Sequence, residues 1–118
     1  MSPVAYKLVD AAEWRAARAA GAYAGSAVDR ADGYIHMSTA EQLVETARRH
    51  YAGRDGLLLV EVALEELGDA LRWEPSRGGE LFPHLYGPLP LSAARSEREL
   101  AVDDDGRPTF ADGATRWP

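Results

Sequence analysis

The run L-L-L-V-E-V-A-L, residues 57–64, constrains the fold of this 118-residue chain more than any other segment. It is almost continuously apolar, which is typical of a strand that is covered on both faces and lies in the middle of a sheet. Four other segments predict further strands: residues 4–9, 33–37, 71–74 and, with a weaker alternation, 90–100. The chain is therefore expected to build a sheet around residues 57–64.

Two helices are predicted between these strands, over residues 11–20 and 40–52. The first starts at Asp10, which stands three residues before Glu13 and so has the spacing of a capping box. Residues 21–33 separate this helix from the next strand. They are rich in Gly, Asp and Ser and have no clear period, so a long loop is expected there, and such loops are often functional.

The fold class that follows is α+β, with one domain over residues 1–118, a core over about 4–100 and an irregular tail over 101–118. The sheet is expected to be curved and largely antiparallel, with two main helices. The segment F-P-H-L-Y-G-P-L-P, residues 82–90, contains too many prolines to be predicted as a central strand.

Composition excludes several functional classes. The apolar share of 46% and the charged share of 27% are those of an ordinary soluble globular protein. The chain has no cysteine, which excludes disulfides and thiol nucleophiles and fits the cytoplasmic location that we expect. No apolar run reaches the roughly 20 residues of a membrane span, and the first residues do not resemble a signal peptide. The net charge of −6 argues against nucleic acid as a partner, and the three histidines lack the spacing of a metal site.

His36 is the first candidate catalytic residue. Within residues 32–39, D-G-Y-I-H-M-S-T, alternation places Tyr34, His36 and Ser38 on one face of a strand. A helix is predicted directly afterwards, and the free N–H groups of a helix N-terminus attract anionic or polar ligands. Two plainer interpretations stay open: His36 as a structural residue, and Ser38 or Thr39 as the cap of the helix.

His84 is the second candidate catalytic residue. Pro83 and Pro88 bracket it and restrict the conformation of the segment, as the precise placement of a binding group requires. In an extended chain Phe82, His84 and Tyr86 share a face. The alternative is that Phe82 and Tyr86 fill the edge of the core while His84 bonds a backbone carbonyl.

Arg77 is a candidate for binding a phosphate or carboxylate, because two glycines follow it and allow close approach of the backbone. The segment is not a P-loop, since the G-K-[ST] element is missing. Just before it, Trp73 is expected in the core and Glu74 at a solvated strand end.

We therefore expect the two histidine segments to face each other across one polar cleft that binds a small, nucleotide-like molecule. Its candidate catalytic residues are His36 and His84. Its candidate ligand-binding residues are Tyr34, Ser38, Thr39, Arg77 and Tyr86.

Four motifs of the chain resemble those of an uncharacterised bacterial family, domain-of-unknown-function family 952. They are Y-K-L, G-A-Y-A-G-S, D-G-Y-I-H-M-S-T-A-E-Q and W-E-P-S-R-G-G-E-L-F-P-H-L-Y-G-P-L, and the resemblance runs from about Ala5 to Arg95. That family is in turn similar, more remotely, to the ADP-ribosyltransferase superfamily. The resemblance implies a split, curved antiparallel sheet with a cleft that holds NAD.

The same resemblance assigns roles to particular positions. Residues 35–39 correspond to the strand and helix start that form one wall under the nicotinamide and ribose. Tyr6 and Lys7 stand where the superfamily usually has its first His or Arg. No Glu lies inside the segment that often carries the catalytic one, and Glu80 precedes it. In such reactions a carboxylate stabilises the oxocarbenium-like centre, and no carboxylate stands at the expected position here. A divergent transferase and a domain that only binds nucleotide therefore both stay open.

Three classes of function follow. The first is an ADP-ribosyltransferase-like enzyme or a domain that binds NAD or ADP-ribose. The second is a histidine-dependent phosphoesterase or another small-molecule-binding protein. H-M-S at His36 is like half of the H-x-[ST] pair of such enzymes, but Tyr86 stands where the second pair needs Ser or Thr. The third is a non-catalytic interaction module, a monomer or weak homodimer, in which Trp14, Trp73 and Tyr86 are packing residues.

Overall fold

The computed structural model describes residues 3–118, apart from the side chain of Arg77. Short 3-10 turns at residues 64–66, 68–70, 77–79 and 91–93 connect some of the regular elements. These elements are β1 (Val4–Asp10), α1 (Ala11–Ala20), β2 (Ala22–Tyr23), α2 (Ala27–Asp32), β3 (Ile35–His36), α3 (Ala40–His50), β4 (Leu57–Ala63), β5 (Leu71–Pro75), β6 (Leu81–Leu85), β7 (Leu89–Pro90), β8 (Ala94–Val102) and β9 (Pro108–Phe110).

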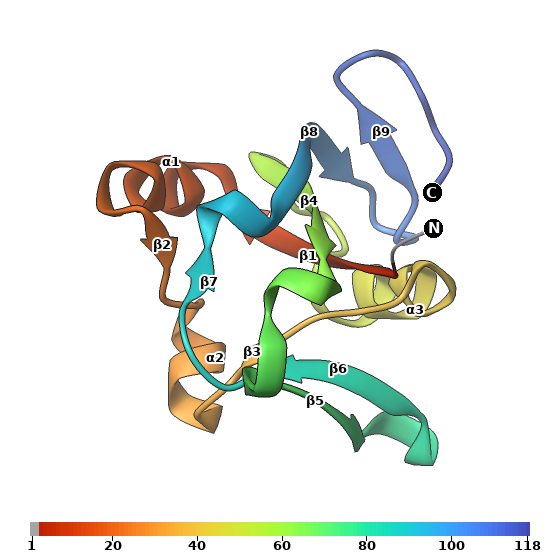
Figure 1. Cartoon of the computed structure of the whole chain (residues 1–118). Helices are drawn as coiled ribbons and strands as arrows, with labels where there is room; N and C mark the ends of the chain where they lie inside the picture. The colour runs from red at the N-terminus through yellow and green to blue at the C-terminus, as the bar shows by residue number, and fades with distance from the viewer. Residues whose placement is uncertain (1–2) are drawn as a thin grey trace.

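The strands form three antiparallel sheets (Figure 1). The largest has the order β1-β4-β8-β9, the second has the order β3-β6-β5, and β2 pairs with β7. β4 lies between β1 and β8, with Tyr6 opposite Glu61 and Leu57 opposite Leu100. The α+β class, the largely antiparallel arrangement and the internal position of residues 57–64 are therefore confirmed.

β4 supplies side chains to both hydrophobic cores of the molecule. On one face these join the core that contains Trp14 of α1 and Ile35 of β3, and on the other face the core that contains Leu43 of α3 and Phe110 of β9. Each fully buried Leu or Val contributes about 1.5–3 kcal/mol relative to an exposed one, which explains the nearly continuous apolar run. The β4 residues concerned are Leu58, Val60 and Val62 for the first core, and Leu57 and Leu59 for the second.

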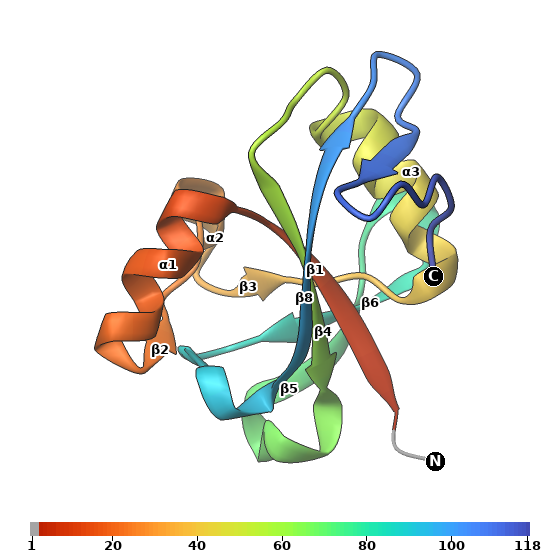
Figure 2. The same ribbon diagram turned by 90° about the horizontal axis from the view of Figure 1, so that it is seen from above.

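Within residues 3–118, the two larger sheets meet at one isolated backbone bridge. Tyr6 of β1 donates its N–H to the carbonyl of Ser38 at 2.7 Å, and Ser38 donates back to the carbonyl of Tyr6 at 2.9 Å. α1 and α2 lie together on one side of the molecule and α3 lies on the other, in both views (Figures 1 and 2). The chain after β3 crosses between them and positions the residues described below.

The long loop predicted over residues 21–33 was wrong, because this stretch contains β2 and the six-residue helix α2. The Ser26 side chain accepts from the N–H of Asp29, and the Asp29 side chain accepts from the N–H of Ser26, which completes a capping box. Gly33 ends the helix with a φ of 89°, in the left-handed region that glycine adopts most easily. The helix is too short to show an apolar period, so its caps are the local signal.

The prolines of residues 82–90 led to a second wrong prediction, because β6 is the central strand of its sheet. The carbonyl of Pro83 accepts from the N–H of Met37 at 3.1 Å, so the proline nitrogen also faces the β3 side. The β3–β6 ladder covers only two residue pairs and ends there. The missing donor therefore costs the β5–β6 ladder nothing.

Two further expectations differ from the structure. After residue 100 the chain continues β8 and then forms β9, where Phe110 is buried in the core beneath α3 instead of lying in an irregular tail. Trp73 is 45% exposed and not a core residue, because it projects from β5 at the edge of its sheet. Within residues 3–118, no helix has the length and apolar character needed to cross a membrane.

Candidate functional site

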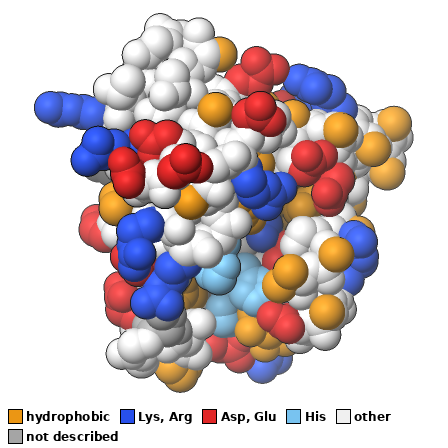
Figure 3. Space-filling view, turned by 180° about the vertical axis from the view of Figure 1, so that it is seen from behind, with side chains coloured by type: hydrophobic (Ala, Val, Ile, Leu, Met, Phe, Trp, Pro, Cys, Tyr) orange, Lys and Arg blue, Asp and Glu red, His pale blue; other side chains and the backbone are white. Residues whose placement is uncertain are grey.

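A cavity of about 440 Å³ lies beside the bridge between the sheets. Residues of β1, α2, β3 and α3 line it, together with the segment that follows α3. On one face of the molecule, histidine side chains lie in a hollow that Lys and Arg side chains flank (Figure 3). The lining includes Lys7, Asp29, His36, Ser38, Thr46 and Arg54.

Asp29 is the centre of the polar contacts in this cavity. Its carboxylate lies 3.0 Å from the Nζ of Lys7 and 2.6 Å from the Nδ1 of His36. It also accepts from the backbone N–H groups of His36 and Ser26, at 3.2 and 2.9 Å. The capping box of α2 thus places one buried carboxylate between β1 and β3. Each of the close contacts given above donates a hydrogen bond to it.

The electrostatics of Asp29 and Lys7 follow from burial and from each other. Burial alone would raise the pKa of Asp29, but the hydrogen bond from His36 and the charge of Lys7 outweigh it and hold the pKa below its usual range. Burial lowers the pKa of Lys7, and the charge of Asp29 opposes that change. A buried pair of this kind is costly to break, because one charge is then left without a partner.

His36 contacts a carboxylate at each ring nitrogen. Nδ1 lies 2.6 Å from Asp29, and Nε2 lies 2.9 Å from the carboxylate of Asp32 at the end of α2. Ionised carboxylates only accept hydrogen bonds, so either carboxylate can accept from a ring N–H of His36. Its side chain is 34% exposed, and Asp32 is half-exposed, so a ligand can reach the ring by displacing Asp32.

His84 lies beside His36 but in a different environment. The two residues are directly opposite in the β3–β6 ladder, and their ring centroids are 5.6 Å apart. The Nδ1 of His84 lies 2.8 Å from the carboxylate of Glu74, which also accepts from the hydroxyl of Tyr86 at 2.8 Å. The hydrogen bonds from His84 and Tyr86 lower the pKa of Glu74. His84 itself is buried and is not among the described residues that line the cavity.

Tyr34 packs against both histidines. Its ring centroid lies 4.5 Å from that of His36, 4.2 Å from that of His84 and 5.2 Å from that of Tyr86. The structure therefore brings Tyr34, His36, His84 and Tyr86 together as an aromatic cluster. Only His36 of these four lines the cavity, so the histidines adjoin within a packed cluster and not across open space.

The remaining candidate residues have separate places. Thr39 is the cap of α3 and forms a capping box with Gln42, whereas Ser38 is not the cap. Ser38 lines the cavity, and its hydroxyl lies 3.0 Å from that of Thr46. The side chain of Arg77 lies outside the described part of the structure, although Ser76 just before it lines the cavity.

Sequence reasoning missed several residues of this cavity, above all Asp29 and Arg54. The spacing of Ser26 and Asp29, S-x-x-D, matches a capping box and was the signal that could have revealed α2 and its carboxylate. Lys7 was noted only through the family resemblance. No local pattern marks Arg54, which follows α3 in an irregular segment.

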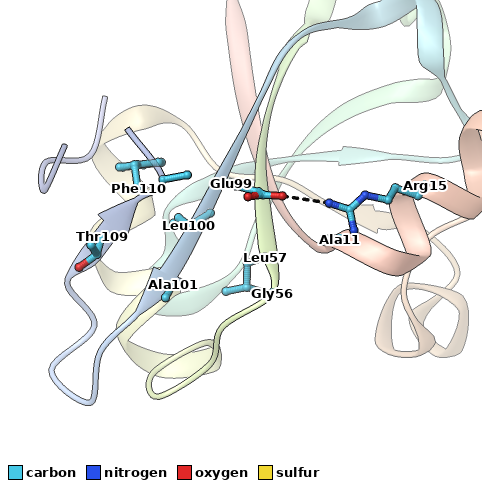
Figure 4. Close-up of a pocket in the computed structure, with 10 residues that line it drawn as sticks. Ala11, Arg15, Gly56, Leu57, Glu99, Leu100, Ala101, Thr109 and Phe110 are labelled. Carbon is cyan, nitrogen blue, oxygen red and sulfur yellow. Dashed lines mark hydrogen bonds and ion pairs between the residues drawn. The ribbon is translucent and has the colours of Figure 1, made fainter. Parts of the chain in front are cut away.

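A second hollow, of about 370 Å³, lies between α1, β8 and β9 (Figure 4). An ion pair of 3.0 Å between Arg15 and Glu99 lies at its α1 side, and both side chains are more than half exposed. Its other lining residues are mainly apolar or backbone groups, so it has fewer polar side chains for a ligand than the larger cavity. Within residues 3–118, no group of three or more His, Asp or Glu side chains is arranged to hold a metal ion.

Comparisons with other proteins agree with this fold. The crystal structure of protein CC0527 from Caulobacter crescentus is 50% identical to this chain, with a TM-score of 0.85 over 90% of this chain and 93% of that one. The solution structure of CC0527 is also 50% identical, with a TM-score of 0.76 over 87% and 89% of the two chains. No curated protein matches the chain. Residues 8–96 match the family described as "Protein of unknown function (DUF952)", and the chain belongs to that family.

Proposed function

We propose that the cavity beside the sheet junction binds NAD or an ADP-ribose-like nucleotide. The observation that carries this proposal is the cavity itself, because about 440 Å³ falls within the range of about 300–1,000 Å³ that is usual for small-molecule sites. Its lining combines cationic groups, Lys7 and Arg54, with the hydroxyls of Ser38 and Thr46. Such groups suit the phosphates and ribose hydroxyls of a nucleotide.

His36 is the central ligand-binding residue in this proposal. Its ring faces the cavity and is oriented by the buried carboxylate of Asp29, so its position is set before a ligand arrives. Exchange of Asp32 for a ligand oxygen leaves the Nε2–H donor satisfied. The remote similarity of the family to ADP-ribosyltransferases supports the same class of ligand.

The carboxylates of the lining favour binding over transfer. Among the described lining residues these are Glu13 and Asp29, and Asp29 is already paired with Lys7 and His36. A carboxylate that already accepts from Lys7 and His36 stabilises a developing oxocarbenium centre poorly. Ligand binding is therefore the function that we assign to the site, and His84 supports it through its contact with Tyr34.

Thermal unfolding in the presence of NAD and ADP-ribose tests this proposal. A ligand at 100 times its Kd stabilises the folded state by about 2.7 kcal/mol, which raises the Tm of a domain of this size by roughly 10 °C. His36→Gln keeps a donor for Asp29 but removes the ring nitrogen that faces Asp32, and it is expected to abolish the shift. Arg49→Gln is the control, since Arg49 pairs with Glu45 on the surface. An unchanged Tm of the wild-type protein at millimolar ligand would refute the proposal.

One observation favours a second candidate, histidine-dependent hydrolysis of phosphoesters. The rings of His36 and His84 are neighbours, and Ser38 lies on the cavity two residues after His36. An assay with cyclic nucleotides and simple phosphoesters separates the two candidates. Hydrolysis by the wild-type protein that is lost in His84→Ala would replace the binding proposal with this one.

A further inference from the structure

Arg54 differs from most of the other described arginines in having no carboxylate partner. Its guanidinium lies 5.0 Å from the centroid of the Tyr51 ring, and it forms no ion pair with any described Asp or Glu. The described arginines that do pair with carboxylates are Arg15, Arg18, Arg48, Arg49, Arg95 and Arg98. Arg54 is thus a guanidinium on the cavity lining whose hydrogen-bonding groups are available to an anion.

The backbone around Arg54 is well anchored. Its N–H donates to the carbonyl of Tyr51 at 3.1 Å, and its carbonyl accepts from the N–H of Val102 in β8 at 2.8 Å. The hydroxyl of Tyr51 donates to the carbonyl of Leu8 in β1 at 3.1 Å. The ring beneath the guanidinium is therefore held against β1, and this platform needs little ordering when a ligand binds.

Two other basic side chains of the cavity already have carboxylate partners. Lys7 pairs with Asp29, and His36 lies between Asp29 and Asp32. The carboxylates come from α1 and α2, whereas Arg54 follows α3, which lies on the other side of the molecule (Figure 2). The lining is therefore asymmetric, with acidic groups on the α2 side and an unpaired positive charge on the α3 side.

We propose that Arg54 binds the diphosphate of the ligand and makes the cavity specific for nucleoside diphosphates and their sugar or pyridinium derivatives. This inference rests on the proposed function. A guanidinium contacts phosphate oxygens through two parallel N–H donors, so one residue recognises both charge and geometry. The other end of the ligand then lies toward His36 and Asp29, where Lys7 already has a carboxylate partner and is less able than Arg54 to bind a phosphate.

Isothermal titration calorimetry with a matched set of ligands tests this assignment. ADP-ribose, ADP and inorganic pyrophosphate carry a diphosphate, and nicotinamide riboside does not. Arg54→Gln is expected to weaken binding of the three diphosphates at least tenfold and to change the Kd of nicotinamide riboside less than twofold. Arg54→Lys keeps the charge but not the planar fork, and we expect an intermediate loss. Arg49→Gln is the control and is expected to bind like the wild-type protein.

The outcomes separate this inference from the proposed function. Equal affinity of Arg54→Gln and the wild-type protein for ADP-ribose would overturn the role of Arg54 and leave nucleotide binding intact. Binding of pyrophosphate that depends on Arg54, without binding of any nucleotide, would support the anion site and overturn the nucleotide proposal. Absence of binding of both pyrophosphate and nucleotides would overturn both. Circular dichroism checks that each variant is folded, as expected for an exposed residue such as Arg54.

Discussion

Two histidine–carboxylate pairs lie side by side in this protein, and they differ in which partner is buried. In the pair of His36 and Asp29 the carboxylate is buried, with 2% of its side chain exposed, and the ring is 34% exposed. In the pair of His84 and Glu74 the ring is buried, with 4% exposed, and the carboxylate is 32% exposed. The same type of contact, between Nδ1 and a carboxylate oxygen, therefore has a different role in each pair. The first pair presents its ring to the cavity, and the second links β5 to β6.

The two carboxylates also differ in what surrounds them. Asp29 receives donors from three segments, β1, α2 and β3, through Lys7, Ser26 and His36. Glu74 receives donors from the hairpin that it belongs to, through His84 and Tyr86. A contact that links several elements is expected to matter for the whole fold, whereas a contact within one hairpin is expected to matter locally. Four mutational and pH experiments examine this contrast.

The largest effect is expected for Asp29→Asn. This change removes the negative charge next to a buried lysine, and breaking a buried pair costs about 3–5 kcal/mol. Glu74→Gln is expected to cost much less, because Glu74 is partly solvated and no buried charge is left alone. Urea unfolding monitored by tryptophan fluorescence measures both free energies. Equal losses in the two variants would contradict the contrast between the pairs.

Acid is expected to act mainly through Asp29. The pKa of this group is lower in the folded state than its ordinary value of 3.8, so its contribution to stability is complete above about pH 4. As the pH falls below that value, the unfolded chain takes up the proton before the folded one does, and about 1 kcal/mol is expected to be lost by pH 3. Urea unfolding at pH 7, 5, 4 and 3 shows this loss. Between pH 4 and 3, the free energy of unfolding is expected to fall less steeply in Asp29→Asn than in the wild-type protein. An unchanged slope would mean that other carboxylates cause the acid sensitivity.

The histidines are expected to separate stability from binding. His84→Ala removes a buried ring that packs on Tyr34, and a loss of about 2–3 kcal/mol is expected. His36→Ala leaves Asp29 paired with Lys7, so a loss of about 1 kcal/mol is expected, together with loss of the ligand-induced Tm shift. Thermal unfolding with and without ADP-ribose gives both quantities for each variant. The reverse order of the two stability losses would show that the pairs had been assigned the wrong roles.

The smallest effect is expected for Asp32→Asn. Its contact with the Nε2 of His36 is a half-exposed ion pair, and such pairs contribute about 0–1 kcal/mol. The variant is expected to unfold at nearly the wild-type urea concentration while Asp29 continues to orient the ring. It also replaces the ionic contact of Nε2 with a weaker, neutral one that a ligand displaces more easily, so the affinity for ADP-ribose is expected to rise slightly. A stability loss comparable to that of Asp29→Asn would mean that both carboxylates are needed to hold His36.

The fold was predictable where a pattern along the chain has one structural solution. The apolar run of β4 required cover on both faces, and the two cores supply it. The spacing of Asp10 and Glu13 marked the start of α1. The same kind of signal at Ser26 and Asp29 was present but lay in a stretch without apolar periodicity, so α2 was missed. Pro83 led to a wrong prediction for β6, because the hydrogen bond that a proline removes from a sheet depends on which neighbouring strand its nitrogen faces.

The candidate site was predictable in part. Alternation placed Tyr34 and His36 on one face of a strand, and the structure brings both next to His84 and Tyr86. Alternation did not reveal that Tyr34 packs against both histidines, or that His84 is buried. Asp29 and Arg54 come from segments with no periodic pattern, so nothing in their local sequence indicated that they line the cavity.

The sequence alone determined which residues are apolar on which face, where α1 and α3 begin, and that His36 lies at the junction of a strand and a helix. These properties follow from the repeat of a strand or helix over a few residues. The tertiary structure decided which charge meets which. Lys7 and Asp29 are 22 residues apart, farther than one turn of a helix or strand pattern reaches. Their contact exists only because the fold brings the N-terminal part of α2 next to Lys7 of β1. Strand register and helix packing set such distances, and a periodic pattern carries no information about them.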